Sequence, residues 1–339
     1  MIKVFFFFDV RQELQEYFLK ELENISDIEL FFFNPFDKDI IFSKAHEADV
    51  FIGWRPTKEL LEKSVNTKVW INPGAGIQHL IDIFKEINSK RTTPISLING
   101  HGNSYFTAQH AVALLLSLTN KVVPHHNWLK EGKWRMSDDE AASEPLRNKT
   151  IGLLGYGAVN SKVHKFLSTF DINFAVLRNK WLEENEDLPT KVKKYTFEEL
   201  ERFLSCIDIL ITTVPLTTKT RNMIGSKELK NLKSHVLIVN IARGEIFEEE
   251  AFYMALKNKD IAGAAIDVWY NYQPEEDEEG RKFPSKYPYY ELENVILSPH
   301  RAASPFSDLE RWNEVIENLK RLAKGRKDLI NQVDLVAEY

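Results

Sequence analysis

The sequence contains a single cysteine, Cys206, in 339 residues, so no disulfide can form within the chain and a reducing compartment is expected. Its longest apolar run, residues 111–118, is much shorter than the ~18 residues that a membrane-spanning helix needs. A basic block is also missing: 44 Lys and Arg against 50 Asp and Glu give a net charge of -6 that is spread along the chain. No signal-peptide cleavage site follows the first residues. We therefore expect a cytoplasmic protein with small-molecule partners and no role for nucleic acid or membrane.

The chain has the composition of a folded globular protein, with 43% hydrophobic and 28% charged residues. Its length favours two domains of about 150 residues each. Apolar runs alternate with helical patterns up to residue 98, turn formers follow at 99–104, and a long apolar helix is expected at 107–123, ended by Pro124. The apolar runs are 3–8, 28–33, 50–53, 69–72 and 95–98, and after Thr150 they are 151–154, 174–177, 207–214, 236–241, 262–267 and 295–298. Continuously apolar runs indicate parallel strands covered on both faces, which predicts an α/β fold.

A glycine turn follows the apolar run that ends at residue 154. It consists of Gly155-Tyr156-Gly157, and a helical pattern begins with Ala158-Val159. Gly155 permits a tight turn, Gly157 lets the backbone approach a pyrophosphate, and the helix offers its free N–H groups. The third glycine of this fingerprint is replaced by Asn160, so the helix is expected slightly farther from the strand. The context favours a dinucleotide site over a plain structural turn.

The next strand ends in Arg178-Asn179-Lys180, where an NAD-binding protein places an acidic residue for the ribose 2′-hydroxyl. A basic pair suits a 2′-phosphate instead, with charge-assisted hydrogen bonds of about 1.5–3 kcal/mol each. We therefore expect NADP, with NAD still possible. The alternative is a solvated basic edge.

Three further segments follow apolar runs, where open α/β sheets bind their ligands. Residues 213–217 include Val214 and Pro215 and can lie along a cofactor, with Thr220 close behind. Residues 239–244 present Ala242 and Arg243. Residues 297–304 contain His300.

The motifs, in this order, resemble those of the D-isomer-specific 2-hydroxyacid dehydrogenases. The matching segments are 73–77, 103–104 with 108–110, the glycine turn, 215–217, 240–244, 265–268 and 298–300. The resemblance implies two Rossmann-like or flavodoxin-like domains with parallel sheets. A substrate domain would comprise residues 1–102 and 301–339, and a dinucleotide-binding domain, residues 103–300, would be inserted into it. It also implies a homodimer formed through the helix near 107–123.

The resemblance further implies roles for single residues. Arg243 would bind the substrate carboxylate and the reacting oxygen, because its planar fork suits a 2-oxo acid. His300 would be the general acid and base. The backbone N–H groups of Ala75, Gly76 and Ile77 would hold the carboxylate, and Asp267 would lie near the cofactor carboxamide. Trp54, which ends a strand of the first domain, could set substrate specificity.

One position departs from the family pattern. The family places a glutamate partner of the histidine five residues after the aspartate, and Tyr272 stands there. A one-residue insertion would bring Gln273 into that place, as in formate dehydrogenases, and Glu275 is the rival. A neutral partner orients the imidazole without stabilising its charge, so the pKa of His300 is expected to be lowered.

The function predicted from these residues is NADP-dependent reduction of a small 2-oxo acid, such as glyoxylate or hydroxypyruvate, to the D-2-hydroxy acid. The alternatives are oxidation of formate and a dinucleotide-sensing protein with little turnover. No metal site is expected, because His125 and His126 are adjacent rather than at metal-ligand spacing. His110 is expected to be a packed helix residue.

Overall fold

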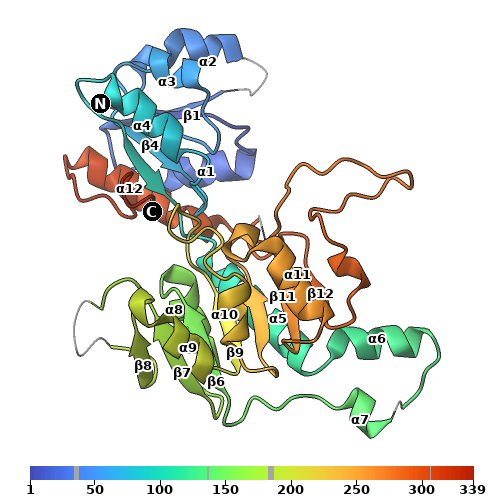
Figure 1. Ribbon diagram of the computed structural model, residues 1–339. Helices are drawn as coiled ribbons and strands as arrows, with labels where there is room; N and C mark the ends of the chain where they lie inside the picture. The colour runs from blue at the N-terminus through green and yellow to red at the C-terminus, as the bar shows by residue number, and fades with distance from the viewer. Residues whose placement is uncertain (34–37, 136, 182–186, 306) are drawn as a thin grey trace. The chain divides into compact units, whose positions relative to one another are not determined.

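The computed structural model describes residues 1–339 except 34–37, 136, 182–186 and 306. The chain divides into two compact units, Met1–Asn103 with Pro305–Tyr339 (unit 1) and Ser104–Ser304 (unit 2) (Figure 1). Each unit is built on one parallel sheet, of five strands in unit 1 and seven in unit 2. The predicted α/β class is therefore confirmed.

The sheet of unit 1 has the strand order β2-β1-β3-β4-β5. Its strands are β1 (Ile2–Phe6), β2 (Ile28–Phe32), β3 (Val50–Ile52), β4 (Val69–Asn72) and β5 (Ser96–Asn99). The phenylalanine side chains of β1 pack on both faces of the sheet, because side chains alternate along a strand. The ring of Phe5 lies 4.8 Å from that of Phe31 on one face, and the ring of Phe6 lies 5.0 Å from that of Phe18 on the other.

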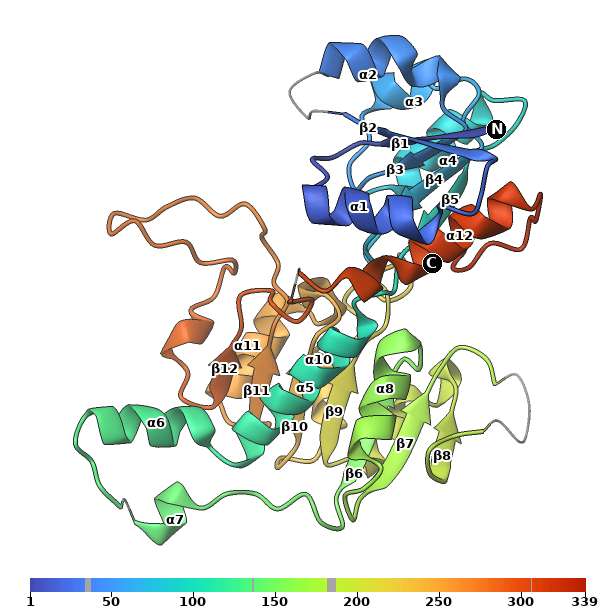
Figure 2. The same ribbon diagram turned by 180° about the vertical axis from the view of Figure 1, so that it is seen from behind.

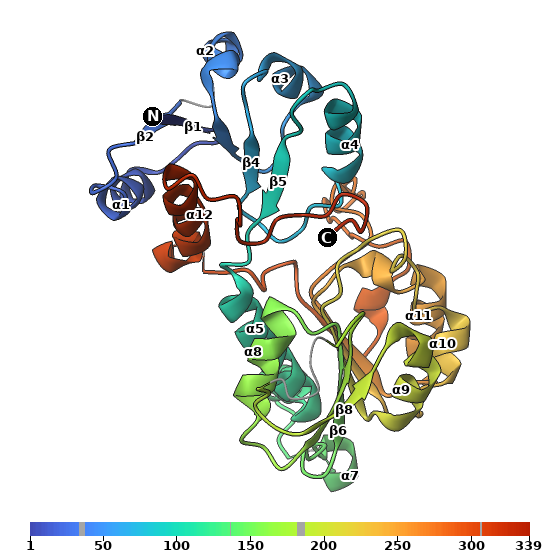
Figure 3. The ribbon, with the colours of Figure 1, turned by 90° about the vertical axis from the view of Figure 1, so that its left-hand side faces the viewer.

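Helices cover both faces of this sheet, as Figure 3 shows from the side. One face packs against α2, α3 and α4, and the other against α1 and α12. Their bounds are α1 (Gln12–Glu21), α2 (Lys38–Lys44), α3 (Lys58–Lys63), α4 (Ile81–Ser89) and α12 (Asn313–Ala323). After α12 the chain returns to β5, where Val333 N–H donates to Leu97 O at 2.9 Å.

The sheet of unit 2 has the strand order β12-β11-β10-β9-β6-β7-β8. Its strands are β6 (Thr150–Leu154), β7 (Asn173–Leu177), β8 (Val192–Tyr195), β9 (Ile209–Thr212), β10 (Leu237–Asn240), β11 (Gly263–Ile266) and β12 (Val295–Leu297). The chain runs outward from β6 to β8 and then returns to β9 on the other side of β6. The loops after β6 and β9 therefore diverge at a topological switch point, where α/β sheets bind ligands.

The two faces of this sheet are covered by different helices. Figure 2 shows α5 (Ser104–Thr119) and α8 (Ala158–Leu167) on one face. The other face is packed by α9 (Leu200–Cys206), α10 (Ser226–Lys230) and α11 (Glu249–Lys257), with Phe203 and Phe252 fully buried beneath them. Short 3-10 helices include η3 (Gly244–Ile246) and η5 (Leu309–Trp312).

The apolar helix expected at 107–123 is shorter than predicted. It ends as α5 at Thr119, and α6 (Val122–Lys130) begins after Lys121, whose φ is +50°. Pro124 does not end a helix but lies in the first turn of α6, where its missing N–H costs nothing. A four-residue helix, α7 (Asp138–Ala141), follows. Among the described residues, no helix is long and apolar enough to cross a membrane.

Candidate functional site

The glycine turn, Gly155-Tyr156-Gly157, connects β6 to α8 at the switch point. Gly155 has φ +82°, and a Cβ there would lie 2.9 Å from Val214 Cγ1, so both the conformation and the space require glycine. A Cβ at Gly157 would meet nothing within 4 Å. That open space lies at the start of α8, whose first N–H groups have no partner within the helix. The turn therefore fits the pyrophosphate of a dinucleotide.

Asn160, which replaces the third glycine, ties the turn to the sheet. Its side chain is fully buried, and Nδ2 donates to Gly155 O at 2.7 Å and to Ile211 O at 3.3 Å. Gly155 belongs to the turn and Ile211 to β9. The substitution thus adds a cross-link between the turn and both central strands, a role that the missing glycine alone did not predict.

Tyr156 is fixed by a buried histidine of α8. The phenol Oη lies 2.8 Å from His164 Nδ1, and His164 Nε2 lies 2.8 Å from Thr190 Oγ1. Burial lowers the pKa of His164 to about 4, so the ring is neutral and both nitrogens are engaged. Tyr156, the middle residue of the glycine turn, is therefore fixed by a contact with the buried His164. Nothing in the sequence pattern indicated this contact.

Arg178 after β7 and Lys194 of β8 lie over the same indole, that of Trp181. The Arg178 guanidinium lies 5.1 Å and the Lys194 ammonium 4.7 Å from the Trp181 ring centroid. Trp181 Nε1 donates to Tyr195 O at 3.1 Å, which fixes the ring. Two cations thus converge at the carboxyl end of β7, and Lys194 of β8 joins a cluster that the sequence had limited to residues 178–180.

The loop from β9 is braced by its own threonines. Thr220 Oγ1 donates to Pro215 O at 2.6 Å, and the Thr217 N–H donates to Thr220 Oγ1 at 2.9 Å. Val214 packs against Gly155. Thr220 therefore shapes the segment that was expected to lie along the cofactor.

Arg243 follows β10 and is held close to the next strand. Its Nη1 donates to Ala242 O at 2.6 Å, and Asn240 Nδ2 donates to Arg243 O at 3.1 Å. A Cβ at Gly244 would lie 2.5 Å from the carbonyl carbon of Trp269, so glycine lets this loop pack directly on the backbone after β11. Burial lowers the pKa of Arg243, but a guanidinium remains charged.

The histidine turn, residues 298–302, follows β12 and is held by Asp267 from the end of β11. The Arg301 N–H donates to Asp267 Oδ1 at 2.8 Å and the Ala302 N–H to Oδ2 at 3.0 Å. Ser298 Oγ donates to the same carboxylate. Between these contacts lies His300, whose φ of +55° is in the left-handed region. The aspartate therefore holds the turn in a conformation that its histidine alone disfavours.

His110 of α5 joins this network. Its Nε2 lies 3.0 Å from Ser298 Oγ and 3.6 Å from Asp267 Oδ1. Burial alone would raise the pKa of Asp267, but the hydrogen bonds from His110, Ser298 and the two amides outweigh it and lower that pKa. The predicted packed helix residue is thus also a polar partner of the buried carboxylate.

The partner of His300 is Tyr272. The two side chains meet at 3.0 Å between Oη and Nδ1, with the rings 84° apart. The structure gives this contact to Tyr272 and not to the predicted partner, Gln273, whose backbone N–H donates to Asn271 Oδ1 at 2.9 Å. No insertion is needed, because a phenol is long enough to reach the imidazole from position 272. The rival, Glu275, is exposed. Partial burial and the charge of Arg243 lower the pKa of His300.

The predicted substrate residues of unit 1 lie after β3 and β4. Asn99 Nδ2 donates to Ala75 O at 3.1 Å, and Ile77 is buried, which fixes the loop on both sides of Gly76. Trp54 stands beside this loop, since a Cβ at Gly74 would lie 3.4 Å from its Nε1. The indole is 37% exposed and packs against Phe8 and Trp312, at 4.7 and 6.0 Å between ring centroids.

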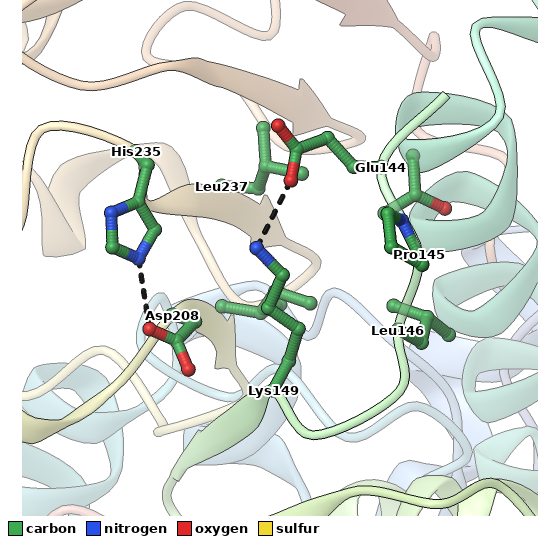
Figure 4. A pocket seen from close by; sticks show the side chains of 9 residues that line it. Glu144, Pro145, Leu146, Lys149, Asp208, His235 and Leu237 are labelled. Atoms are coloured by element: carbon green, nitrogen blue, oxygen red, sulfur yellow. Dashed lines mark hydrogen bonds and ion pairs between the residues drawn. The ribbon is translucent and has the colours of Figure 1, made fainter. Parts of the chain in front are cut away.

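At the amino ends of β6, β9 and β10, the unit 2 sheet carries paired charges instead of predicted site residues. Around a small hollow there, His235 Nε2 lies 2.8 Å from Asp208 Oδ1 and Lys149 Nζ lies 3.0 Å from Glu144 Oε2 (Figure 4). Lys233 Nζ and the Thr150 N–H also donate to Asp208, at 2.8 and 2.7 Å. The charged side chains around this hollow are paired with one another. Such pairing is typical of residues that stabilise the fold.

Comparison with known proteins agrees with the site geometry. Residues 112–302 match the family described as D-isomer specific 2-hydroxyacid dehydrogenase, NAD binding domain. The chain belongs to this family. The resemblance drawn from the motifs is therefore confirmed at the level of the family.

Named relatives of this dehydrogenase family differ in activity and length. The D-3-phosphoglycerate dehydrogenase of Archaeoglobus fulgidus is 30% identical over 269 residues, which cover 79% of this chain and 47% of that protein. The chain thus spans about half the length of that relative. The glyoxylate reductase of Thermococcus litoralis is 28% identical over 344 residues, covering 95% of this chain and 96% of that protein.

Solved structures of the dehydrogenase family share the fold. The NADPH-dependent glyoxylate/hydroxypyruvate reductase of Sinorhizobium meliloti, in complex with NADP and sulfate, superposes with a TM-score of 0.76 at 19% identity over the whole of both chains. The NAD-dependent formate dehydrogenase of Staphylococcus aureus gives 0.66 at 23% identity, covering 96% of this chain and 95% of that one.

Proposed function

We propose that this chain catalyses NADP-dependent reduction of a small 2-oxo acid to the D-2-hydroxy acid. The observation that carries the proposal is the convergence of three adjacent strand ends in unit 2. Arg243 follows β10, Asp267 follows β11 and His300 follows β12, and these strands are neighbours in the sheet. The glycine turn opens from β6 in the same sheet. A cation, an anchored imidazole and a pyrophosphate site are what hydride transfer to a 2-oxo acid requires.

Each residue then has a chemical task. The Arg243 guanidinium pairs with the substrate carboxylate and polarises the carbonyl at C2. Hydride for C2 would come from a nicotinamide dinucleotide when one is bound at the glycine turn. His300 gives its Nε2 proton to the carbonyl oxygen as negative charge develops there, and it takes the hydroxyl proton back in the opposite direction. Asp267 acts by holding the histidine turn, and a place near the cofactor carboxamide remains part of the proposal.

The proposal also gives substrate roles to single residues of unit 1. Backbone N–H groups of Ala75, Gly76 and Ile77 would bind the substrate carboxylate, and Trp54 would select among side chains. The fixed loop and the half-exposed indole beside it support this assignment. A small substrate such as glyoxylate or hydroxypyruvate suits it, and the relatives named glyoxylate reductases favour the same class.

For the cofactor, we propose NADP over NAD. The support is the cation cluster at the end of β7, Arg178 and Lys194 on Trp181, with Lys180 exposed nearby. Two positive charges suit a 2′-phosphate, and a charge-assisted hydrogen bond contributes about 1.5–3 kcal/mol, or one to two decades of preference. Arg178→Gln should lower the ratio of kcat/KM with NADPH to that with NADH by at least tenfold.

The remaining part of the proposal is a homodimer. Helix α6 and the segment after it expose Val122, Val123, Leu129 and Trp134, the last at 75%. Such a row of apolar side chains suits an interface between two copies. Leu129→Lys should shift the mass measured by light scattering from two chains to one, whereas Leu19→Lys, on another exposed apolar site, should not.

Oxidation of formate loses its main support, because that hypothesis depended on Gln273 as the partner of His300. The decisive experiment is a panel of 2-oxo acids with NADH and NADPH, beside formate with NAD and NADP. Reduction of a 2-oxo acid is expected, and Arg243→Ala should lower its kcat/KM by about 100-fold or more with cofactor affinity unchanged. Unchanged turnover in that variant would refute the proposal. Cofactor binding without turnover of any acid would favour a sensing protein.

A further inference from the structure

The phenol of Tyr272 lies between a backbone amide and the imidazole of His300. Its Oη is 3.0 Å from His300 Nδ1, and the Trp269 N–H donates to the same oxygen at 3.3 Å. Trp269 is itself fixed, because its Nε1 donates to Ser298 O at 2.9 Å. The amide, the phenol and the imidazole thus form a chain that runs from Trp269 to the histidine turn, and the Trp269 indole bonds to the same turn.

We propose that Tyr272 is the positioning residue of His300, and that it orients the imidazole through Nδ1 without adding a negative charge. The inference rests on the proposed function, because the orientation of the ring matters for catalysis only if His300 exchanges a proton with the substrate. The backbone of the histidine turn sets where the ring is attached. The contact to Tyr272 sets how the ring is rotated and which nitrogen exchanges its proton with substrate.

The donor and acceptor inventory of the phenol allows two arrangements, in which Oη either accepts from Nδ1–H or donates to Nδ1, and the proposed arrangement is the first. Oη has two lone pairs and one proton. The Trp269 N–H uses one lone pair, and the other can accept from His300 Nδ1–H. With Nδ1 protonated and held, Nε2 is left as the nitrogen that gives or takes the substrate proton.

The charges around His300 do not favour the imidazolium. Tyr272 is 51% exposed, and the partial burial of its phenol raises its pKa, outweighing the Trp269 N–H and the charge of Arg243, so the phenol stays neutral across ordinary pH. The charged groups acting on His300 are Arg243, Arg301 and Asp267, and the two arginines oppose its protonation. A carboxylate at position 272 would add an attractive charge that the phenol lacks.

The consequence is a particular pH profile. Reduction needs protonated His300, so its kcat/KM should fall with rising pH at a lower pH than for an unperturbed histidine. Oxidation of the hydroxy acid needs the neutral ring and should persist toward acid. Tyr272→Glu should move the reductive limb to higher pH. Tyr272→Phe should lower kcat about tenfold or more without moving the limb upward.

The test that is independent of turnover is NMR titration of the full-length protein labelled with ¹⁵N-histidine. His300→Gln assigns the signal, and Tyr290→Phe, an exposed tyrosine of the same loop, is the matched control. In the wild type and in Tyr290→Phe, neutral His300 is expected as the Nδ1–H tautomer. Tyr272→Phe should give a mixture of tautomers, and Tyr272→Glu should lower the proton dissociation constant of His300 at least tenfold.

Two results would overturn the positioning role. One is the same tautomer signal in Tyr272→Phe as in the wild type, which does not depend on the glutamate variant folding. The other is an unchanged titration of His300 in folded Tyr272→Glu. If instead the NMR results hold and no 2-oxo acid is reduced, the proposed function fails while Tyr272 remains the partner that orients His300.

Discussion

The glycine turn after β6 and the histidine turn after β12 each contain a residue with positive φ and accommodate it differently. Gly155 has φ +82° and His300 has φ +55°. Glycine adopts this region freely, whereas another residue is strained there by about 1–3 kcal/mol. The proposed dinucleotide site needs backbone near a ligand and no side chain in the glycine turn. The proposed proton donor requires an imidazole in the histidine turn, and the hydrogen bonds to Asp267 offset the strain that it brings.

The largest effect is expected at His300, where two substitutions distinguish the loss of activity from the relief of backbone strain. His300→Ala and His300→Gly should both lower kcat/KM by about 10²–10⁴-fold, because the proposed proton donor is lost. His300→Gly should also be more stable than His300→Ala by about 1 kcal/mol, because only glycine relieves the positive φ. Enzyme kinetics and urea denaturation measure the two effects. Equal stability of the two variants would show that the turn is not strained.

The second prediction removes the anchor of the histidine turn. Asp267→Asn should destabilise the protein by about 2–3 kcal/mol, because an amide places a donor against the backbone N–H groups of Arg301 or Ala302. Activity should fall with it, since His300 loses its fixed position. Asp208→Asn is the matched control, a carboxylate with a backbone donor at the amino ends of the strands. Asp208→Asn should lower the free energy of unfolding and leave kcat unchanged. Equal losses of kcat in both would contradict a specific anchoring role.

The third prediction tests the division of labour within the glycine turn. Gly155→Ala should destabilise the protein by about 1–3 kcal/mol, since a Cβ meets both a positive φ and Val214. Gly157→Ala should leave stability unchanged and weaken cofactor affinity on the order of tenfold, since its Cβ occupies open space where a pyrophosphate would lie. Thermal unfolding and cofactor titration distinguish them. Undiminished cofactor affinity in Gly157→Ala would remove the pyrophosphate from this turn.

The fourth prediction concerns pH and the paired charges at the amino ends of β6, β9 and β10. Burial alone would raise the pKa of Asp208, but hydrogen bonds from Lys233, His235 and the Thr150 amide outweigh it and lower the pKa to about 2. A carboxyl group with a lowered folded-state pKa stabilises the fold above its ordinary pKa. The contribution, about 2 kcal/mol, should be lost as pH falls from about 4 to about 2. Wild type and Asp208→Asn should therefore converge in stability at acid pH, and a constant difference would contradict this.

The smallest effect is expected from the contact that holds Tyr156. Tyr156→Phe leaves His164 Nδ1 without its partner and should cost about 1 kcal/mol of stability. Cofactor affinity should fall roughly fivefold if the whole of that energy orders the turn. Tyr290→Phe, which removes an exposed hydroxyl, should change neither quantity. Calorimetry and cofactor titration measure both.

Much of the fold followed from the sequence because buried parallel strands are apolar without interruption. The strand missed was β8, whose central residues Lys193 and Lys194 are exposed at the sheet edge, so it lacks that pattern. The helix at 107–123 was overextended for a different reason. Its break is a backbone conformation at Lys121 that composition does not reveal.

By itself, the sequence determined the positions of the glycine turn, Arg243 and His300, because each is a local motif at the end of an apolar strand. The tertiary structure alone decided the partners of those residues. Tyr272 lies 28 residues before His300, Asn160 reaches β9 across 51 residues, and His110 meets Ser298 across 188. Such contacts depend on the paths of loops and on the order of strands in the sheet. The type of a side chain determines which hydrogen bonds it can form, but not which residues lie close enough to form them.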